Sequence, residues 1–247
     1  MSVDELRFKE AKIKVMSELS DGEGIGRLGE KLIHKILKAY FEPNGEYHEV
    51  SFLGSVADVK NEKEIIEVQT RGFDRLRPKL LKFLPEIPVT VVYPIIKEKN
   101  VIWLDKETGE LSKPHRSPRK GMALDVFVEL YKLYGIAPHE RLTVKLVFLA
   151  VDEYKTLDGW DKTRKRGASK IEKIPRAITE ITELKTLEDY RALIPKELGK
   201  SFTAKEFNKV TGLRASRAYY ALKFLLTFGF AEREMGSGRA YVYTMKE

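Results

Sequence analysis

The sequence contains no cysteine and no long apolar run. Without cysteine, this chain of 247 residues has no disulfide, no thiolate metal site and no cysteine nucleophile. No apolar stretch is long enough to cross a membrane, and the acidic residues that follow Met1 give no secretory signal. Neither a repeat nor a low-complexity tract is visible. We therefore expect a cytoplasmic protein that has no membrane partner.

The residues that are present are those of a globular protein with a sizeable core. Hydrophobic residues make up 43% of the chain and charged residues 33%. The length fits one large domain or two smaller ones. The formal net charge of +8 favours polyanionic partners, because cations that contact phosphates release counterions. Charge alone does not decide the function, since many basic proteins have no nucleic-acid role.

Hydrophobic periodicity predicts an α/β core with a mixed sheet, because helical and strand-like patterns alternate along the chain. Helices are expected at 4–19, 27–41 and 73–83, within 118–134, and again at 177–193. Strands are expected at 46–60, with a bend at Gly54, and at 64–69, 89–96, 101–104 and 142–151. Pro78 is expected to shorten or kink the third helix.

Two acids and an amide are predicted to meet on one hairpin. Glu67 and Gln69 are two apart in a strand and therefore share a face, and Asp58 lies on the partner strand. Glu30 reaches in from the flanking helix. His34, one turn later, is interpreted as a surface or lightly packed histidine. Such an oxygen-rich pocket suits a hard cation such as Mg²⁺ or Mn²⁺.

This pattern resembles the PD-(D/E)XK nuclease superfamily, which includes restriction endonucleases and Holliday-junction resolvases. The resemblance covers residues 20–105. It matches Asp58 to the motif aspartate and Glu67-Val68-Gln69 to the (D/E)XK element, with Glu30 on the first core helix.

The resemblance implies that Asp58, Glu67 and the Val68 carbonyl bind Mg²⁺, and that Glu30 holds a second metal ion or its water shell. Gln69 stands where the superfamily has a lysine that polarises the attacking water, and some restriction enzymes also carry glutamine there. Ala57 replaces the proline that precedes the motif aspartate.

This region has two other interpretations. Asp58 and Glu67 could simply lie on a solvated sheet face, because carboxylates are mostly exposed. The run Gly24-Ile25-Gly26-Arg27-Leu28-Gly29 spells the dinucleotide-binding fingerprint, but a charged helix precedes it where that fingerprint needs a strand.

A basic stretch follows the core. Seven lysines and arginines lie between Asp161 and Arg176. Trp160 directly precedes this stretch. Stacking of Trp160 on a base and contacts of the lysines and arginines with phosphates would suit nucleic acid. The alternative is a solvated loop. The predicted contacts are Trp160, Lys162, Arg164, Lys165 and Arg166.

The C-terminal part resembles the winged helix-turn-helix family. Thr203 and Glu206 predict a capped helix, Thr211-Gly212-Leu213 a turn, 215–228 a second helix, and 231–234 with 239–244 a hairpin. In that family the second helix enters the major groove and the hairpin wing contacts the backbone. The predicted contacts are Arg214, Ser216, Arg217 and, on the wing, Arg239. The alternative is a winged helix used for protein contact.

Together these patterns predict an α/β, restriction-endonuclease-like core with a C-terminal winged helix domain. The expected divisions are 1–155 for the core, 156–194 for a connecting region and 195–247 for the winged helix. The predicted function is Mg²⁺-dependent hydrolysis of DNA. The alternative is a non-catalytic DNA-binding protein or regulator, and a homodimer is left open.

Overall fold

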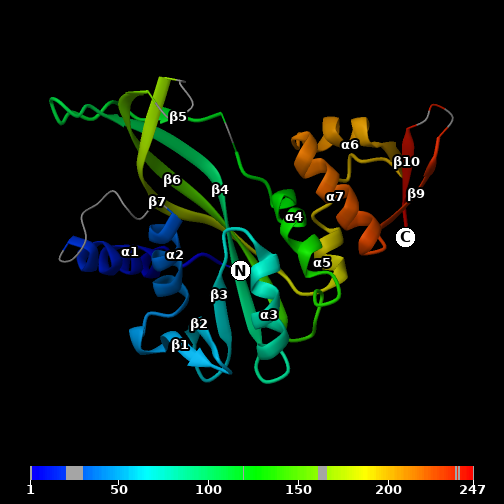
Figure 1. Ribbon diagram of the computed structural model, residues 1–247, viewed down its shortest axis with the longest axis horizontal. Helices are drawn as coiled ribbons and strands as arrows, with labels where there is room; N and C mark the ends of the chain where they lie inside the picture. Colours follow the sequence, from blue (N-terminus) through cyan, green and yellow to red (C-terminus); the bar gives the residue numbers. More distant parts are fainter. Residues whose placement is uncertain are drawn as a thin grey trace. The chain divides into compact units, whose positions relative to one another are not determined.

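The computed structural model describes residues 2–20, 30–118, 120–160, 166–236, 238 and 240–246. The chain forms two units, each assembled from three stretches of sequence (Figure 1). Unit 1 contains Met1–Thr70, Thr90–Gly121 and Lys145–Thr182, and unit 2 contains Arg71–Val89, Met122–Val144 and Glu183–Glu247. The predicted mixed α/β class is confirmed. The predicted divisions at 155 and 195 stay a prediction.

A mixed seven-stranded sheet forms the framework of unit 1. Its strands pair in the order β1-β2-β3-β4-β6-β7, and β5 pairs with β4 off this path. The strands are β1 (His48–Phe52), β2 (Ser55–Lys60), β3 (Ile65–Val68), β4 (Val89–Leu104), β5 (His115–Arg116), β6 (Leu142–Trp160) and β7 (Arg166–Leu184).

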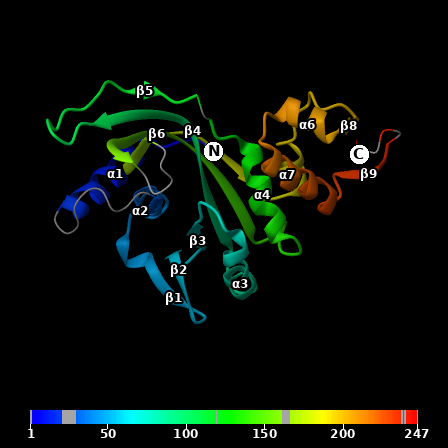
Figure 2. The ribbon, with the colours of Figure 1, turned by 45° about the horizontal axis from the view of Figure 1, so that its top comes forward.

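Two helices, α1 (Glu5–Ser20) and α2 (Glu30–Phe41), pack on this sheet in unit 1 (Figure 2). Their apolar residues share one core with the strands, because a helix with one apolar stripe must bury it against another element. The core includes Phe8, Val15, Ile36, Leu37, Val59, Ile66, Val68 and Val147. A short 3₁₀ helix, η1 (Gly45–Tyr47), leads from α2 into the sheet.

Several secondary-structure predictions are corrected by the structure. Within the strand expected at 46–60, residues 48–60 form a hairpin that turns at Leu53 and Gly54, with φ of 49° and 70°. Hairpin turns at positive φ usually contain glycine, asparagine or aspartate. Leu53 therefore does not indicate a turn in the sequence. The two strands expected at 89–96 and 101–104 are one strand, β4.

The helix predicted at 177–193 is wrong over most of its length, because β7 extends to Leu184 and only α5 (Leu187–Arg191) is helical. The apolar residues Ile174, Ile178 and Ile181 have helical spacing. The segment is also rich in β-branched residues, which fit a pleated surface, and pairing with β6 decides the outcome.

Unit 2 consists mainly of helices. These are α3 (Phe73–Phe83), η2 (Ala123–Val126), α4 (Phe127–Leu130), η3 (Tyr131–Leu133), α5, α6 (Ala204–Thr211) and α7 (Ala215–Thr227). Pro78 lies inside α3 without ending it. The helix expected within 118–134 is an irregular run of η2, α4 and η3. A small sheet pairs β8 (Ser201–Thr203), β10 (Tyr241–Met245) and β9 (Ala231–Met235), in the order β8-β10-β9.

The end of unit 2 follows its local signals closely. Thr203 and Glu206 form the predicted capping box at the start of α6. Gly212 ends that helix with φ of 64°, a conformation that glycine adopts without strain. Phe224 of α7 is fully buried and stacks on Phe127 of α4, with ring centroids 4.2 Å apart. Within the described residues, no helix is long and apolar enough to cross a membrane.

Candidate functional site

The two predicted strand acids lie on neighbouring antiparallel strands. Asp58 is on β2 and Glu67 is on β3. The recorded pairs join Val59 to Ile66 and Lys60 to Ile65. One step further along the same register, residue 58 lies opposite residue 67. The two positions thus meet across the hairpin, as the sequence predicts.

The carboxylate of Asp58 connects β3 to α2. Its Oδ2 accepts a hydrogen bond from the backbone N–H of Val68 at 2.8 Å and lies 2.9 Å from Nε2 of His34. An ionised carboxylate only accepts hydrogen bonds, so Nε2 of His34 carries the hydrogen. The side chains of Asp58 and His34 are 15% and 29% exposed. The carboxylate is therefore fixed in direction yet still reachable.

Glu67 is far less accessible than Asp58. Only 2% of the surface of Glu67 is exposed to solvent, and all four residues of β3 are buried. A carboxylate in such a place is costly unless cations or hydrogen-bond donors compensate its charge. A buried carboxylate in the middle of a strand therefore needs such partners. The alternative prediction of a solvated sheet face does not hold for Glu67.

Gln69 follows β3 and is partly exposed. Its backbone N–H donates to the carbonyl of Val92 on β4 at 2.9 Å, so the chain is still paired at this point. Residues two apart in an extended chain point the same way, which places Gln69 on the same side as Glu67. Its amide can donate and accept, but it carries no charge.

The oxygen atoms of this site are of the kind that Mg²⁺ prefers. Asp58 and Glu67 contribute carboxylates, and Val68, whose backbone N–H contacts Asp58, adds its carbonyl. Among the described residues, no group of three or more His, Cys, Asp or Glu is arranged to hold a metal ion. A metal would thus depend on two carboxylates and a carbonyl, with water completing its shell. Glu30 opens α2, but its side chain lies outside the described part of the chain.

His34 is the residue of this site that sequence reasoning passed over. Its position one turn after Glu30 indicated the correct side of α2. The sequence gave no sign of a partner, because the contact with Asp58 spans 24 positions. A histidine next to an apolar stripe is usually packed without function, which is why the contact had to come from the structure.

Most side chains of the basic stretch lie outside the described part of the chain. Trp160 ends β6 and Arg166 begins β7, but their side chains are not described. Lys162, Arg164 and Lys165 lie outside the described residues. The predicted nucleic-acid contacts of this segment therefore stay predictions.

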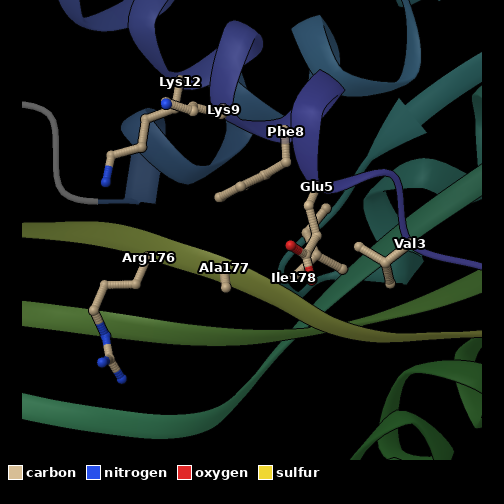
Figure 3. A pocket seen from close by; sticks show the side chains of 8 residues that line it. All are labelled: Val3, Glu5, Phe8, Lys9, Lys12, Arg176, Ala177 and Ile178. Carbon is tan, nitrogen blue, oxygen red and sulfur yellow. The ribbon is translucent and has the colours of Figure 1, made fainter.

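A cleft of about 320 Å³ opens between α1 and β7 within unit 1 (Figure 3). It is lined by Val3, Glu5, Phe8, Lys9, Lys12, Arg176, Ala177 and Ile178. The guanidinium of Arg176 is turned away from α1 and pairs with Asp152 at 3.2 Å. The cleft is therefore an apolar groove with lysines on one wall, and it contains no catalytic set.

The predicted contacts of the C-terminal part lie near the start of α7. Arg214 is the N-cap residue, and Arg214 and Ser216 are exposed. Arg217 forms an ion pair with Asp125 of η2, and its side chain is 54% exposed. This pairing competes with any base contact by Arg217. Arg239 lies outside the described residues.

These features define an α/β protein with a buried and a partly exposed acid facing each other on a hairpin, and sequence comparison gives its family. Residues 31–185 match the family model described as "Domain of unknown function (DUF8091)", which is more than half of the chain, so the chain belongs to that family. It is also 31% identical over 221 residues to an "Uncharacterized protein" of Treponema pallidum (strain Nichols), covering 85% of this chain and 83% of the relative. No solved structure matches the chain significantly.

Proposed function

We propose that this protein is a Mg²⁺-dependent nuclease that hydrolyses DNA phosphodiester bonds. The observation that carries the proposal is the meeting of Asp58 with Glu67 across the β2–β3 hairpin, with Gln69 on the side of Glu67. The order of elements supports it as well. From α2 onward, the antiparallel strands β1, β2 and β3 are followed by the helix α3 and the strand β4. A helix and a β-rich run after the motif strands are what the resemblance to the PD-(D/E)XK superfamily implies.

In this proposal Asp58, Glu67 and the Val68 carbonyl hold the cation. Bound Mg²⁺ would supply a Lewis acid for the phosphate and would lower the pKa of a water molecule. Gln69 orients the attacking water through its amide, because a glutamine cannot serve as a charged group or a base. His34 keeps the Asp58 carboxylate in one direction, as outer partners of metal ligands commonly do.

The DNA-binding part of the proposal is α6, α7 and the β9–β10 hairpin. Their order resembles a winged helix, in which α7 would enter the major groove. From residue 199 to the end there are nine lysines and arginines against four glutamates. Arg214 and Ser216 are exposed at the start of α7, where base contacts of such helices usually originate.

The test is a panel of labelled duplex, single-stranded and branched DNAs, incubated with Mg²⁺, with Mn²⁺ or with a chelator. Metal-dependent cleavage of at least one substrate is expected. It should be lost in Asp58→Asn and kept in Asp105→Asn, a matched change in an exposed turn. Metal-independent cleavage, or cleavage that survives Asp58→Asn in a folded protein, would contradict the assignment.

A second candidate is a non-catalytic DNA-binding protein with a degenerate nuclease core, and Gln69 in the lysine position favours it. The two candidates differ in metal binding. Calorimetric titration with Mn²⁺ should show a site that Asp58→Asn removes if the core is active. DNA binding without a metal site and without cleavage would favour the second candidate.

A further inference from the structure

The exposed face of α7 carries two tyrosines and a lysine in a single stripe. Ser216, Tyr219, Tyr220 and Lys223 follow one another at i, i+3, i+4 and i+7, which places them on one side of a helix. Tyr219 and Tyr220 are 53% and 39% exposed. The buried residues of the same helix, including Ala218, Leu222 and Leu225, form its inner side.

A third ring from η3 in the same unit extends this surface. Tyr131 lies with its ring centroid 6.1 Å from that of Tyr220, and Tyr219 lies 5.5 Å from Tyr220 at an interplanar angle of 74°. Nζ of Lys223 is 4.8 Å from the centre of the Tyr219 ring and 5.7 Å from that of Tyr131. We call Tyr131, Tyr219, Tyr220 and Lys223 the tyrosine–lysine face.

The lysine of this face remains charged. A hydrogen bond with Tyr219, followed by the electrostatic effect of both tyrosines, raises the pKa of Lys223 above its ordinary value. Arg214 adds a further exposed cation at the start of the same helix. Exposed rings interleaved with cations match the chemistry of a nucleic-acid strand, which offers flat bases and phosphates together.

The rings favour unpaired bases over a duplex. Base edges in the major groove are recognised by side chains such as Arg, Asn and Gln. The flat faces of paired bases are covered by their neighbours in the stack, so a tyrosine ring cannot stack on them. A base in a single strand offers its face freely, and each stacked base adds affinity without regard to sequence.

We propose that the tyrosine–lysine face binds unpaired bases, so that the preferred partner is a nucleic acid with a single-stranded stretch. The proposal rests on the proposed function only in taking nucleic acid as the partner. Tyr219 and Tyr220 stack on bases, and Lys223 contacts a phosphate. Arg214 and Ser216 remain available for an adjoining duplex, which fits a substrate that joins single-stranded and duplex segments.

The test measures binding of the full-length protein in a chelator, by fluorescence anisotropy. The labelled probes are an oligothymidylate, a blunt duplex of equal length, and a duplex with an oligothymidylate overhang. The oligothymidylate and the overhang should bind more tightly than the blunt duplex. Tyr219→Ala and Tyr220→Ala should each weaken their binding by about fivefold to 150-fold, which corresponds to the loss of one stacked base.

Two further variants separate stacking from other causes. Tyr219→Phe keeps the ring and should bind the oligothymidylate as the wild type does. Tyr134→Ala, which removes a comparably exposed tyrosine that follows η3, should leave the affinity for the oligothymidylate unchanged. Lys223→Gln should reduce the slope of log affinity against log salt by about 0.7, the value for one phosphate contact with a single strand.

The binding test is independent of cleavage, because the chelator removes the metal ion that the proposed cleavage needs. Equal binding by the wild type and both alanine variants, in protein with unchanged circular dichroism, overturns it. So does a preference for the blunt duplex. Cleavage that requires Mg²⁺ could still stand in either case, and a tyrosine-dependent affinity could stand without any cleavage.

Discussion

The acid pair of the β2–β3 hairpin and the tyrosine–lysine face of α7 are opposite kinds of surface. Asp58 and Glu67 are anionic, mostly enclosed, and held by strand pairing and by a helix. The tyrosine–lysine face is cationic and aromatic, and its two tyrosines on α7 are exposed. Enclosed acids can concentrate a metal ion and a few waters, whereas exposed rings and cations can follow a long strand.

The proposed function needs both kinds of surface. A polyanion is attracted by surface cations, but its phosphate must come close to carboxylates that repel it. A divalent cation between them removes that repulsion. The proposed division of labour thus makes binding independent of the metal and makes hydrolysis depend on it.

The largest effect is expected on stability, where α7 packs on α4. Phe224→Ala removes a fully buried ring that stacks on Phe127, and the loss should cost about 3–5 kcal/mol of unfolding free energy. Urea denaturation of the full chain measures it. Thr227→Ala, at the partly exposed end of the same helix, is the control. A loss below about 1 kcal/mol would mean that α7 does not depend on α4.

The next effect concerns the acid pair. Glu67→Gln keeps the shape of the side chain and removes the charge, so cleavage should fall by at least about a hundredfold, more than the loss of an outer partner. DNA affinity in a chelator should be unchanged, since the α7 face is intact. Glu62→Gln, in the exposed turn before β3, should leave both unaltered. A variant that cleaves as the wild type does would remove Glu67 from the site.

A smaller effect is expected from the histidine that contacts Asp58. His34→Ala should lower metal affinity and cleavage by about 10- to 100-fold, as for other outer partners of metal ligands. His115→Ala, on the exposed strand β5, is the control. His34→Asn retains an N–H donor and should recover part of the loss. Full activity in His34→Ala would show that Asp58 needs no support from α2.

The smallest effect is expected at the cap of α6. Thr203→Ala removes the side-chain acceptor of the Glu206 N–H and should cost about 1 kcal/mol of unfolding free energy. Denaturant unfolding measures it, with Lys205→Ala as the control on the same turn. An unchanged stability would indicate that β8 fixes the start of α6 without the cap.

The same cap predicts a pH dependence. The backbone N–H of Thr203, and then its hydroxyl, lower the pKa of Glu206 below the ordinary value of 4.5. This interaction therefore stabilises the fold at pH values above about 4.5 and is lost as the pH falls through the lower, folded value. The stability difference between wild type and Glu206→Gln should shrink over that range. A difference that grows on acidification would contradict the sign.

The two regions also differ in how far the sequence predicted them. The cap at Thr203, the glycine at 212 and the ends of α7 are local signals, and each of them was predicted correctly. The contact of His34 with Asp58 depends on tertiary packing, which no local pattern records. The same is true of β7, whose isoleucines have helical spacing and whose strand form depends on β6.

The interleaving of the two units has a consequence for synthesis on the ribosome. Three stretches of each unit alternate along the chain, so the polypeptide passes from one to the other five times. Unit 2 remains incomplete until its last stretch leaves the exit tunnel, because Phe224, on which Phe127 stacks, belongs to that stretch. A nascent chain therefore leaves Phe127 without its stacking partner until residue 224 has been synthesised. No single cut releases either unit as a continuous fragment.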